Sequence, residues 1–469
     1  MTRINRRAFL SGVAATGAAL AASPLPQSVA AQPAANASSS PHDNPPSESS
    51  HDVIDFRYAP LLRQTAFCFP DDPYKSLLNQ AGELLYEYPS GASALFFALK
   101  IGFALDGMNT ATVLSQQLES PSIPIVRTTL TYPGVSMLLI TFATNDAGEG
   151  RVDNVIVEVT PHSAVTLNIE PLIDFDTLEK FDLEERDGMI SVLRRPQRQV
   201  LLVGKVLENN APSTGHTAAL HNSTDRSEQL AFHRGQASKA HPWRAFFRFP
   251  LAQQDASPAI AALAHPEKCL ESCRAFWKSW SATLAPVAMT VPGRQGEFVQ
   301  ACARNILQAR EVRDGKLTFQ VGPTCYRGLW VVDGNFILEA ARYLGHDKEA
   351  MEGLRTTWAG QLPNGQVVGS GGKEHWKDTA IAMFTLVRQC ELSQDWSPLR
   401  ELEPQVVHAV QFLRSLQAEA IRQDSALGRY GLLARGFADG GIGGLRDEFT
   451  NTLWALAGLK AITQAAEQR

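Results

Sequence analysis

The strongest constraint on the fold is a change in hydrophobic period about halfway along the 469-residue chain. From about residue 52 to residue 256, apolar and polar residues alternate, which is the period of β-strands. Val155, Val157 and Val159 point to one side of such a strand, and the alternation resumes after residues 161–163. Short strands at this spacing, without helical runs, predict an antiparallel β-sandwich over residues 52–256.

From about residue 257 the period becomes helical. Cys269, Cys273 and Trp277 recur at intervals of four, as residues on one face of a helix do. Similar patterns predict further helices at 298–307, 336–344, 348–360, 376–392, 397–420 and 448–466. Helical hairpins in series predict an α/α toroid over residues 257–469. About eight helices can be counted where a complete (α/α)6 barrel has about twelve, so an incomplete barrel and a simple bundle stay open.

The N-terminus is typical of a bacterial twin-arginine export signal. Arg6 and Arg7 precede Phe9-Leu10 and a short apolar stretch at residues 13–22, too short to cross a bilayer. Residues 1–31 are therefore expected to be a removable leader recognised by the twin-arginine export machinery. Residues 32–51 are rich in Pro, Ala and Ser and predict a linker without a core. The mature protein would be periplasmic or secreted.

Composition excludes several classes of protein. With 44% hydrophobic residues, 19% charged residues and a formal net charge of −5, the chain is globular and lacks the basic character expected of a nucleic-acid-binding protein. The mature chain has no apolar run of about 20 residues, which is the length that a membrane-spanning helix needs. Six scattered cysteines do not make a disulfide framework. Without a CxxC or HExxH motif, neither a metal nor an organic cofactor is expected.

Three polar loops, each leading into a predicted helix, carry the candidate site residues. The first, at residues 325–335, brings Arg327, Trp330 and Asp333 together. Glycosidic cleavage needs a carboxylic acid near an apolar wall and aromatic rings for the faces of sugars. A carboxylate at a helix N-terminus is also a common cap that contributes about 1 kcal/mol, so a purely structural role stays open for Asp333.

The second and third loops have the same character. Residues 371–380 place four candidate substrate-contacting side chains before a helix: Glu374, His375, Trp376 and Lys377. Residues 436–448 are glycine-rich, which indicates a tight loop, and contain Asp439 and Glu448. Helix capping is again the structural alternative for the acidic residues. Three such loops are expected to lie together at one end of a toroid.

These segments resemble the six-hairpin glycosidases, the group of glucoamylase-like and trehalase-like (α/α)6 enzymes. The resemblance lies in YRGLWVVDGNFILEAARYLG at 326–345, EHWKDTAIAMFTLVRQCEL at 374–392 and GLLARGFADGGIGGLRDEFTNTLWALAGLKA at 431–461. Many such enzymes carry a β-sandwich before the barrel, and the order of elements predicted here is the same.

The resemblance implies roles for particular residues. Asp333 would be the general acid of an inverting glycoside hydrolase acting on an oligo- or polysaccharide, although Val332 stands where relatives commonly have arginine. Glu448 is the first candidate for the base and Asp439 the second. One alternative is a polysaccharide lyase that uses Tyr326 and His375. Another is a truncated, non-catalytic sugar-binding protein.

Overall fold

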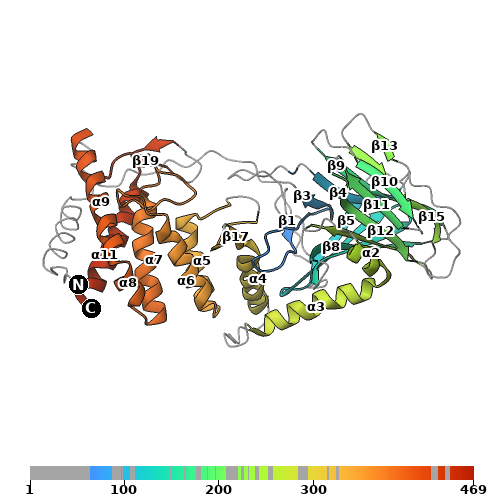
Figure 1. Ribbon diagram of the computed structural model, residues 1–469, viewed down its shortest axis with the longest axis horizontal. Helices are drawn as coiled ribbons and strands as arrows, with labels where there is room; N and C mark the ends of the chain where they lie inside the picture. The colour runs from blue at the N-terminus through green and yellow to red at the C-terminus, as the bar shows by residue number, and fades with distance from the viewer. Residues whose placement is uncertain are drawn as a thin grey trace, which may run out of the picture. The chain divides into compact units, whose positions relative to one another are not determined.

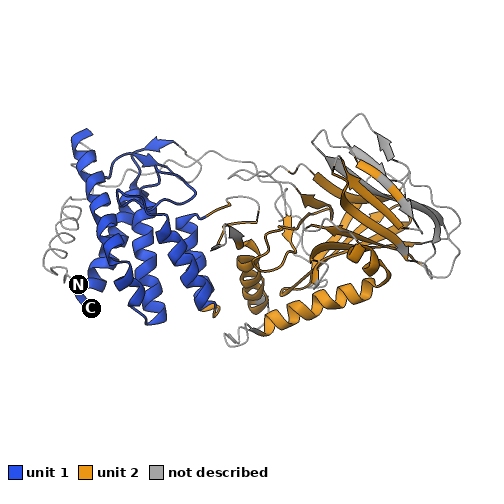
Figure 2. Cartoon of the chain, viewed as in Figure 1, with its two compact units in different colours: residues 1–51, 329–342, 346–469 blue, residues 52–328, 343–345 orange. Residues whose placement is uncertain are grey.

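The computed structural model divides the chain into two compact units (Figures 1 and 2). The sheet unit comprises residues 52–328 and 343–345, and the helical unit comprises residues 1–51, 329–342 and 346–469. The described residues are 64–86, 97, 99–105, 111–146, 150–162, 165–175, 181–186, 189–195, 197–207, 220–222, 227–230, 232–237, 242–251, 257–283, 294–313, 316–323, 327–423, 431–438 and 444–468. The predicted leader and linker lie outside them.

Two eight-stranded antiparallel sheets make up most of the sheet unit. The first contains β1 (Gln64–Ala66), β2 (Leu77–Asn79), β3 (Leu84–Tyr86), β4 (Leu99–Leu105), β9 (Val165–Phe175), β13 (Leu220–Asn222), β14 (Ser227–Leu230) and β15 (Phe232–Ala237). The second contains β5 (Thr112–Ser120), β6 (Ile123–Tyr132), β7 (Val135–Asp146), β8 (Gly150–Pro161), β10 (Phe181–Arg186), β11 (Met189–Arg194), β12 (Gln199–Leu207) and β16 (Trp243–Pro250).

The two sheets share one hydrophobic core. Leu84 and Ile101 of the first sheet belong to the same buried cluster as Val157 and Phe246 of the second. The helix α3 (Pro266–Thr283) packs against β6 and β7 and adds Trp277 to this cluster. Apolar side chains on both faces of the second sheet are therefore buried. The sequence predicts that buried and exposed residues alternate along the strands, whereas nearly every residue of β8 and β16 is buried.

The chain passes from one sheet to the other between β8 and β9. Although the two strands are neighbours in sequence, β8 pairs with β7 and β16, whereas β9 pairs with β4, β14 and β15. The sequence correctly predicts both strands around residues 161–163 but does not reveal which sheet each one joins. Strand pairing depends on contacts that are remote in sequence.

A network of buried charges links the two sheets. Arg151 of β8 donates from Nε to Asp72 (2.5 Å) and from Nη1 to Asp153 (2.6 Å). Its Nη2 donates to the hydroxyl of Ser76 (2.7 Å), and Tyr86 donates its hydroxyl to Asp153 (2.8 Å). These charged side chains are almost fully buried, so each depends on the others for its hydrogen bonds.

The sheet unit also contains helices that the sequence assigns to the helical domain. Besides α3, these are α2 (Ser257–Ala261), the 3-10 turn η2 (Ala262–Ala264) and α4 (Arg294–Ala309), followed by a hairpin of β17 (Glu311–Arg313) and β18 (Lys316–Thr318). The sequence places the domain boundary near residue 256, whereas the compact sheet unit continues to Gly328. The reason is that α3 completes the core of the sheets, as Trp277 shows.

The helical unit contains α5 (Val331–Tyr343), α6 (Asp347–Ala359), α7 (Lys377–Ser393), α8 (Ser397–Glu401), α9 (Glu403–Gln423), the two-stranded β19 (Gly436–Phe437) and β20 (Leu445–Arg446), and α11 (Phe449–Gln468). These helices lie where the period predicts them, with one difference. The segment predicted at 397–420 is divided at Leu402 into α8 and α9. Pro404 accounts for the break, because proline is tolerated in the first turn of a helix but not in its interior.

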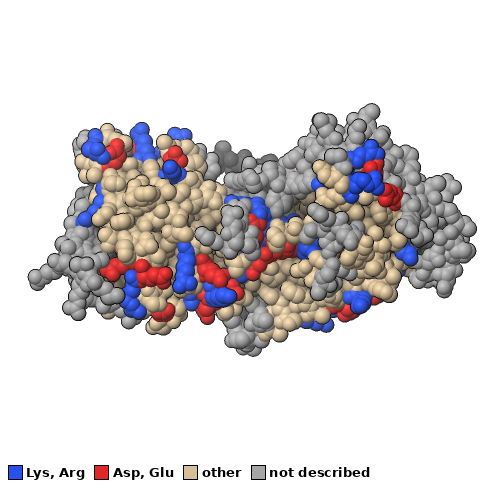
Figure 3. All heavy atoms as spheres, viewed as in Figure 1, with Lys and Arg blue, Asp and Glu red and all other residues tan. Residues whose placement is uncertain are grey.

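No helix within the described ranges is both long and apolar enough to cross a membrane. On the face of the molecule drawn in Figure 3, basic and acidic side chains lie close to one another. In the helical unit, basic and acidic side chains form ion pairs such as Arg342 with Asp347 and Arg388 with Glu339.

Replacing Gly458 of α11 with alanine is expected to destabilise the protein by about 1–3 kcal/mol. A methyl group at this position would overlap the backbone carbonyl of Ala380 in α7, so the two helices would have to separate. Gly334 of α5 is a matched control, because its added methyl would meet only Leu329 Cδ1 at 3.7 Å. Gly334→Ala should be neutral or slightly stabilising. Chemical denaturation measures both, and equal effects would contradict the packing argument.

Candidate functional site

Three helices of the helical unit begin at the same end. Helices α5 and α7 run in the same direction, since Thr385 Oγ1 bonds to Asn335 Oδ1 (2.9 Å) and Arg388 Nη2 bonds one turn later to Glu339 (2.8 Å). The start of α11 joins them, because the Lys377 backbone N–H donates to Asn451 Oδ1 (3.2 Å). The loops that precede the three helices are thereby brought together, as the sequence predicts.

Lys377 occupies the centre of this end. Lys377 is 2% exposed, although the sequence predicts that it contacts a substrate. Burial lowers the pKa of Lys377, and the nearby carboxyl groups of Glu448, Asp378 and Asp333 raise it in turn. Three carboxyl groups, one from each of the segments that begin α5, α7 and α11, are therefore near enough to raise the pKa of this ammonium group.

Asp378, the residue after Lys377, was not among the predicted site residues. It is 2% exposed, and its carboxyl accepts a hydrogen bond from the Gly369 backbone N–H. Burial raises the pKa of Asp378 to about 7; the Gly369 bond and Lys377 oppose this change, and Asp333 adds to it. A carboxyl group with this pKa is about half protonated at neutral pH, so it can supply a proton there.

Asp333 and Glu448 differ in how they are held. Asp333 lies in the first turn of α5, half-buried, and no described residue hydrogen-bonds to its carboxyl group. Glu448 directly precedes α11 and accepts hydrogen bonds from the Thr450 hydroxyl and from Asn451 Nδ2 (2.8 Å). Both donors are side chains of α11, so they fix the position of the Glu448 carboxyl group without capping the helix backbone.

A stack of flat rings borders the carboxyl groups. The imidazole of His375 stacks on Phe437, with ring centroids 4.6 Å apart and planes 14° apart. Trp330 meets His375 edge-on at 6.1 Å. Burial lowers the pKa of His375, and the nearby positive charge of Lys377 lowers it further. The imidazole is therefore neutral at pH 7 and forms part of an aromatic wall, to which Phe437, unnoticed in the sequence, contributes.

The other predicted site residues lie elsewhere or serve the fold. Trp376 donates its indole N–H to the Arg435 carbonyl (2.7 Å) and packs on Phe412. Glu374 is exposed, and its backbone carbonyl accepts a hydrogen bond from Phe437.

Arg327, which the sequence groups with Trp330 and Asp333, belongs to the sheet unit. There it forms an ion pair with Glu311 and donates to the Pro323 carbonyl (2.6 Å). Asp439, the second candidate base, and Tyr326, the candidate lyase residue, lie outside the described residues.

The described residues contain no group of three or more His, Cys, Asp or Glu side chains placed to hold a metal ion. The chemistry that the cluster can perform with its own side chains is proton transfer. A carboxyl of raised pKa at Asp378, with the carboxyl groups of Asp333 and Glu448 near it, supplies the components of general acid–base catalysis.

Substituting asparagine for Asp378 is expected to change how stability depends on pH. The folded state holds a proton on Asp378 up to about pH 7, whereas an unfolded aspartate releases it near pH 3.9. Folding therefore becomes less favourable as the pH rises from about 4 to about 7, by on the order of a few kcal/mol. Asparagine removes this loss, so the variant should gain stability relative to the wild type across that window.

Urea denaturation between pH 4 and pH 8 measures the difference. Asp347→Asn is the control, because that aspartate also lies in the first turn of a helix but is exposed. Parallel pH profiles for the wild type and Asp378→Asn would contradict the prediction.

No family model matches the chain, and no curated protein matches it either. Among solved structures, the fold is similar to that of a bacterial glucoamylase complexed with acarbose, with 9% identity, a TM-score of 0.52 and coverage of 89% of this chain and 68% of that chain. A protein from the human microbiome assigned as a kojibiose phosphorylase has 10% identity, a TM-score of 0.42 and coverage of 74% and 52%. A gh92 family glycosyl hydrolase has 12% identity, a TM-score of 0.35 and coverage of 75% and 61%. The chain, with its antiparallel sheets followed by helices, thus has a fold similar to that of the glucoamylase structure.

Proposed function

We propose that the protein is a carbohydrate-active enzyme that hydrolyses glycosidic bonds by general acid–base catalysis. The observation that carries this proposal is that Asp333, Asp378 and Glu448 lie at the starts of three helices that begin at the same end of the unit. Asn451 links two of these starts, because it bonds to Glu448 and to the backbone N–H of Lys377. Trp330 and Phe437, both half-buried, pack against the buried His375 and offer flat apolar surfaces to a sugar. The fold likeness to glucoamylase agrees with this function but does not establish it.

The division of roles follows from how each carboxyl group is held. Asp378 holds a proton near neutral pH, because burial and, to a smaller extent, the charge of Asp333 raise its pKa. Asp333, the less buried of the two, delivers the proton to the glycosidic oxygen. Glu448, held at the start of α11 by Asn451, acts as the base and activates a water molecule. In an inverting enzyme these two carboxyl groups would lie about 6.5–9.5 Å apart, on opposite faces of the sugar.

The fold family, the location and the substrate class of the protein belong to the same proposal. The helices from α5 to α11 form part of an α/α toroid, and the chain is a six-hairpin glycosidase. The twin arginines Arg6 and Arg7 and the apolar stretch at 13–22 support export through the twin-arginine pathway to the periplasm or beyond. The substrate is an oligo- or polysaccharide, and the reaction needs no cofactor.

Reducing-sugar release from a panel of neutral and acidic glycans tests the proposal, with the wild type beside Asp333→Asn. We expect release by the wild type alone. NMR should show that the anomer formed first has the configuration opposite to that of the cleaved bond. Equal release by both proteins would remove the acid role from Asp333. Unsaturated products that absorb in the ultraviolet would establish a lyase instead, and glycan binding without any product would establish a binding protein.

A further inference from the structure

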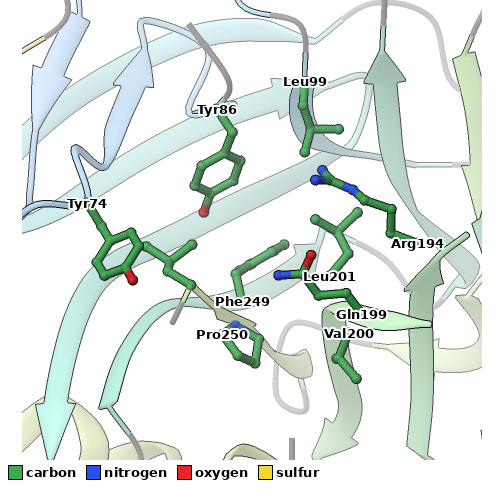
Figure 4. Close-up of a pocket in the computed structure, with 10 residues that line it drawn as sticks. Tyr74, Tyr86, Leu99, Arg194, Gln199, Val200, Leu201, Phe249 and Pro250 are labelled. Carbon is green, nitrogen blue, oxygen red and sulfur yellow. The ribbon is translucent and has the colours of Figure 1, made fainter. Parts of the chain in front are cut away.

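A cavity of about 180 Å³ lies within the sheet unit, apart from the residues of the proposed catalytic cluster. Figure 4 shows side chains from both sheets around it, including Tyr86 at the end of β3 and Phe249 of β16. The space exceeds by more than tenfold the roughly 10–15 Å³ that a single water molecule requires. A ring-sized organic ligand is therefore compatible with its volume.

Flat and apolar side chains form much of the wall. Tyr74, Tyr86 and Phe249 contribute aromatic rings, and the rings of Tyr86 and Phe249 lie 6.4 Å apart with a tilt of 38°. Tyr86 is held in place because its hydroxyl donates to the buried Asp153 (2.8 Å). Burial raises the pKa of Tyr86 well above its usual value, so the phenol stays neutral. The oxygen of this hydroxyl can still accept a hydrogen bond from a ligand.

The polar groups of the wall are suited to an anion. Arg194 of β11 and Gln199 of β12 line the cavity, and none of the described lining residues is acidic. In Figure 4 both polar side chains extend to the same side of the cavity. A guanidinium group has five N–H donors in a fork that matches a carboxylate, so it can bind a ligand while bonding elsewhere.

We propose that this cavity binds a small ring-shaped carboxylate, namely a hexuronate, either free or at the end of an acidic glycan. Arg194 and Gln199 would hold the carboxylate, while Tyr74, Tyr86 and Phe249 contact the ring. The choice of a sugar as the ring rests on the proposed carbohydrate activity, whereas the carboxylate follows from Arg194 alone. The site is thus a second, non-catalytic sugar site, in the unit that carries the sheets.

Isothermal titration of the full chain with glucuronate, galacturonate and glucose tests this site. The wild type should bind a hexuronate about 10- to 100-fold more tightly than glucose, the range expected for a charge-assisted hydrogen bond. Arg194→Leu should remove this preference. Arg195→Leu is the matched control, because the adjacent Arg195 does not line the cavity and is exposed beside Asp182. It should bind as the wild type does.

Two further variants separate this site from the proposed catalytic cluster. Leu201→Phe would fill the cavity without changing its charge and should also abolish hexuronate binding. Asp333→Asn should leave that binding intact, whatever its effect on hydrolysis. Unchanged binding in Arg194→Leu, or binding lost in Asp333→Asn but kept in Leu201→Phe, would overturn the proposal. Circular dichroism of each variant shows that a loss of binding does not reflect a loss of fold.

Discussion

Replacing Asp333 with asparagine is expected to slow glycosidic cleavage by about 10²- to 10⁴-fold, the usual contribution of a general acid. Asparagine has nearly the same size but cannot donate a carboxyl proton to the glycosidic oxygen. No described residue hydrogen-bonds to the Asp333 carboxyl, so the change should leave the local structure intact. Glu448→Gln should cause a loss of similar size, since glutamine cannot take a proton. Its carbonyl oxygen can still accept from Asn451, while its NH2 group can donate to the Thr450 hydroxyl oxygen.

Initial rates on the most reactive glycan of the panel measure both effects. Asp347→Asn is the matched control, because it removes an aspartate from the first turn of α6 in the same unit, at an exposed position. Its rate should equal that of the wild type. A full rate in Asp333→Asn together with a large loss in Asp378→Asn would transfer the acid role to Asp378.

Replacing Arg151 with methionine is expected to destabilise the protein by about 3–5 kcal/mol. The carboxylates of Asp72 and Asp153 are almost fully buried and would lose the cation that compensates both of them. The Ser76 hydroxyl would lose a donor as well. The loss is large because a buried, uncompensated charge has neither water nor a counterion to stabilise it.

Thermal and urea denaturation at pH 7 compare this variant with Arg198→Met. Arg198 is exposed and forms ion pairs with Asp182 and Glu184, so its replacement should cost less than about 1 kcal/mol. Adding Asp72→Asn and Asp153→Asn to Arg151→Met should recover part of the loss. Equal destabilisation by the two arginine replacements would show that burial of the network does not govern its energetics.

Much of the secondary structure follows from local patterns. The predicted helix at 376–392 corresponds to α7 at Lys377–Ser393, and the one at 448–466 corresponds to α11 at Phe449–Gln468. Apolar residues at intervals of three and four are sufficient to predict such helices, because each helix buries one face. The break between α8 and α9 shows the limit of period alone, since Pro404 acts through its missing N–H rather than through hydropathy.

Pairings between remote segments could not be predicted in the same way. Nothing in the alternation of β8 and β9 indicates that they join different sheets. The pattern of Trp277 predicts a helix but not that this helix completes the core of the sheets. Arg327, which lies within the first candidate loop, is paired with Glu311 in the sheet unit. Sequence proximity is therefore a weak guide to the composition of a site.

The sequence by itself determined the order of sheet-forming and helical regions and the three polar loops that begin α5, α7 and α11. These features depend on period and on residue type, which are local properties. Only the tertiary structure decided that Asp333, Asp378 and Glu448 share the buried Lys377, and that His375 lies against Phe437. The pKa of about 7 at Asp378 arises from burial and neighbouring charges. The cluster of carboxyl groups and the raised pKa of Asp378 depend on segments that are distant in sequence, so they exist only once the chain has folded.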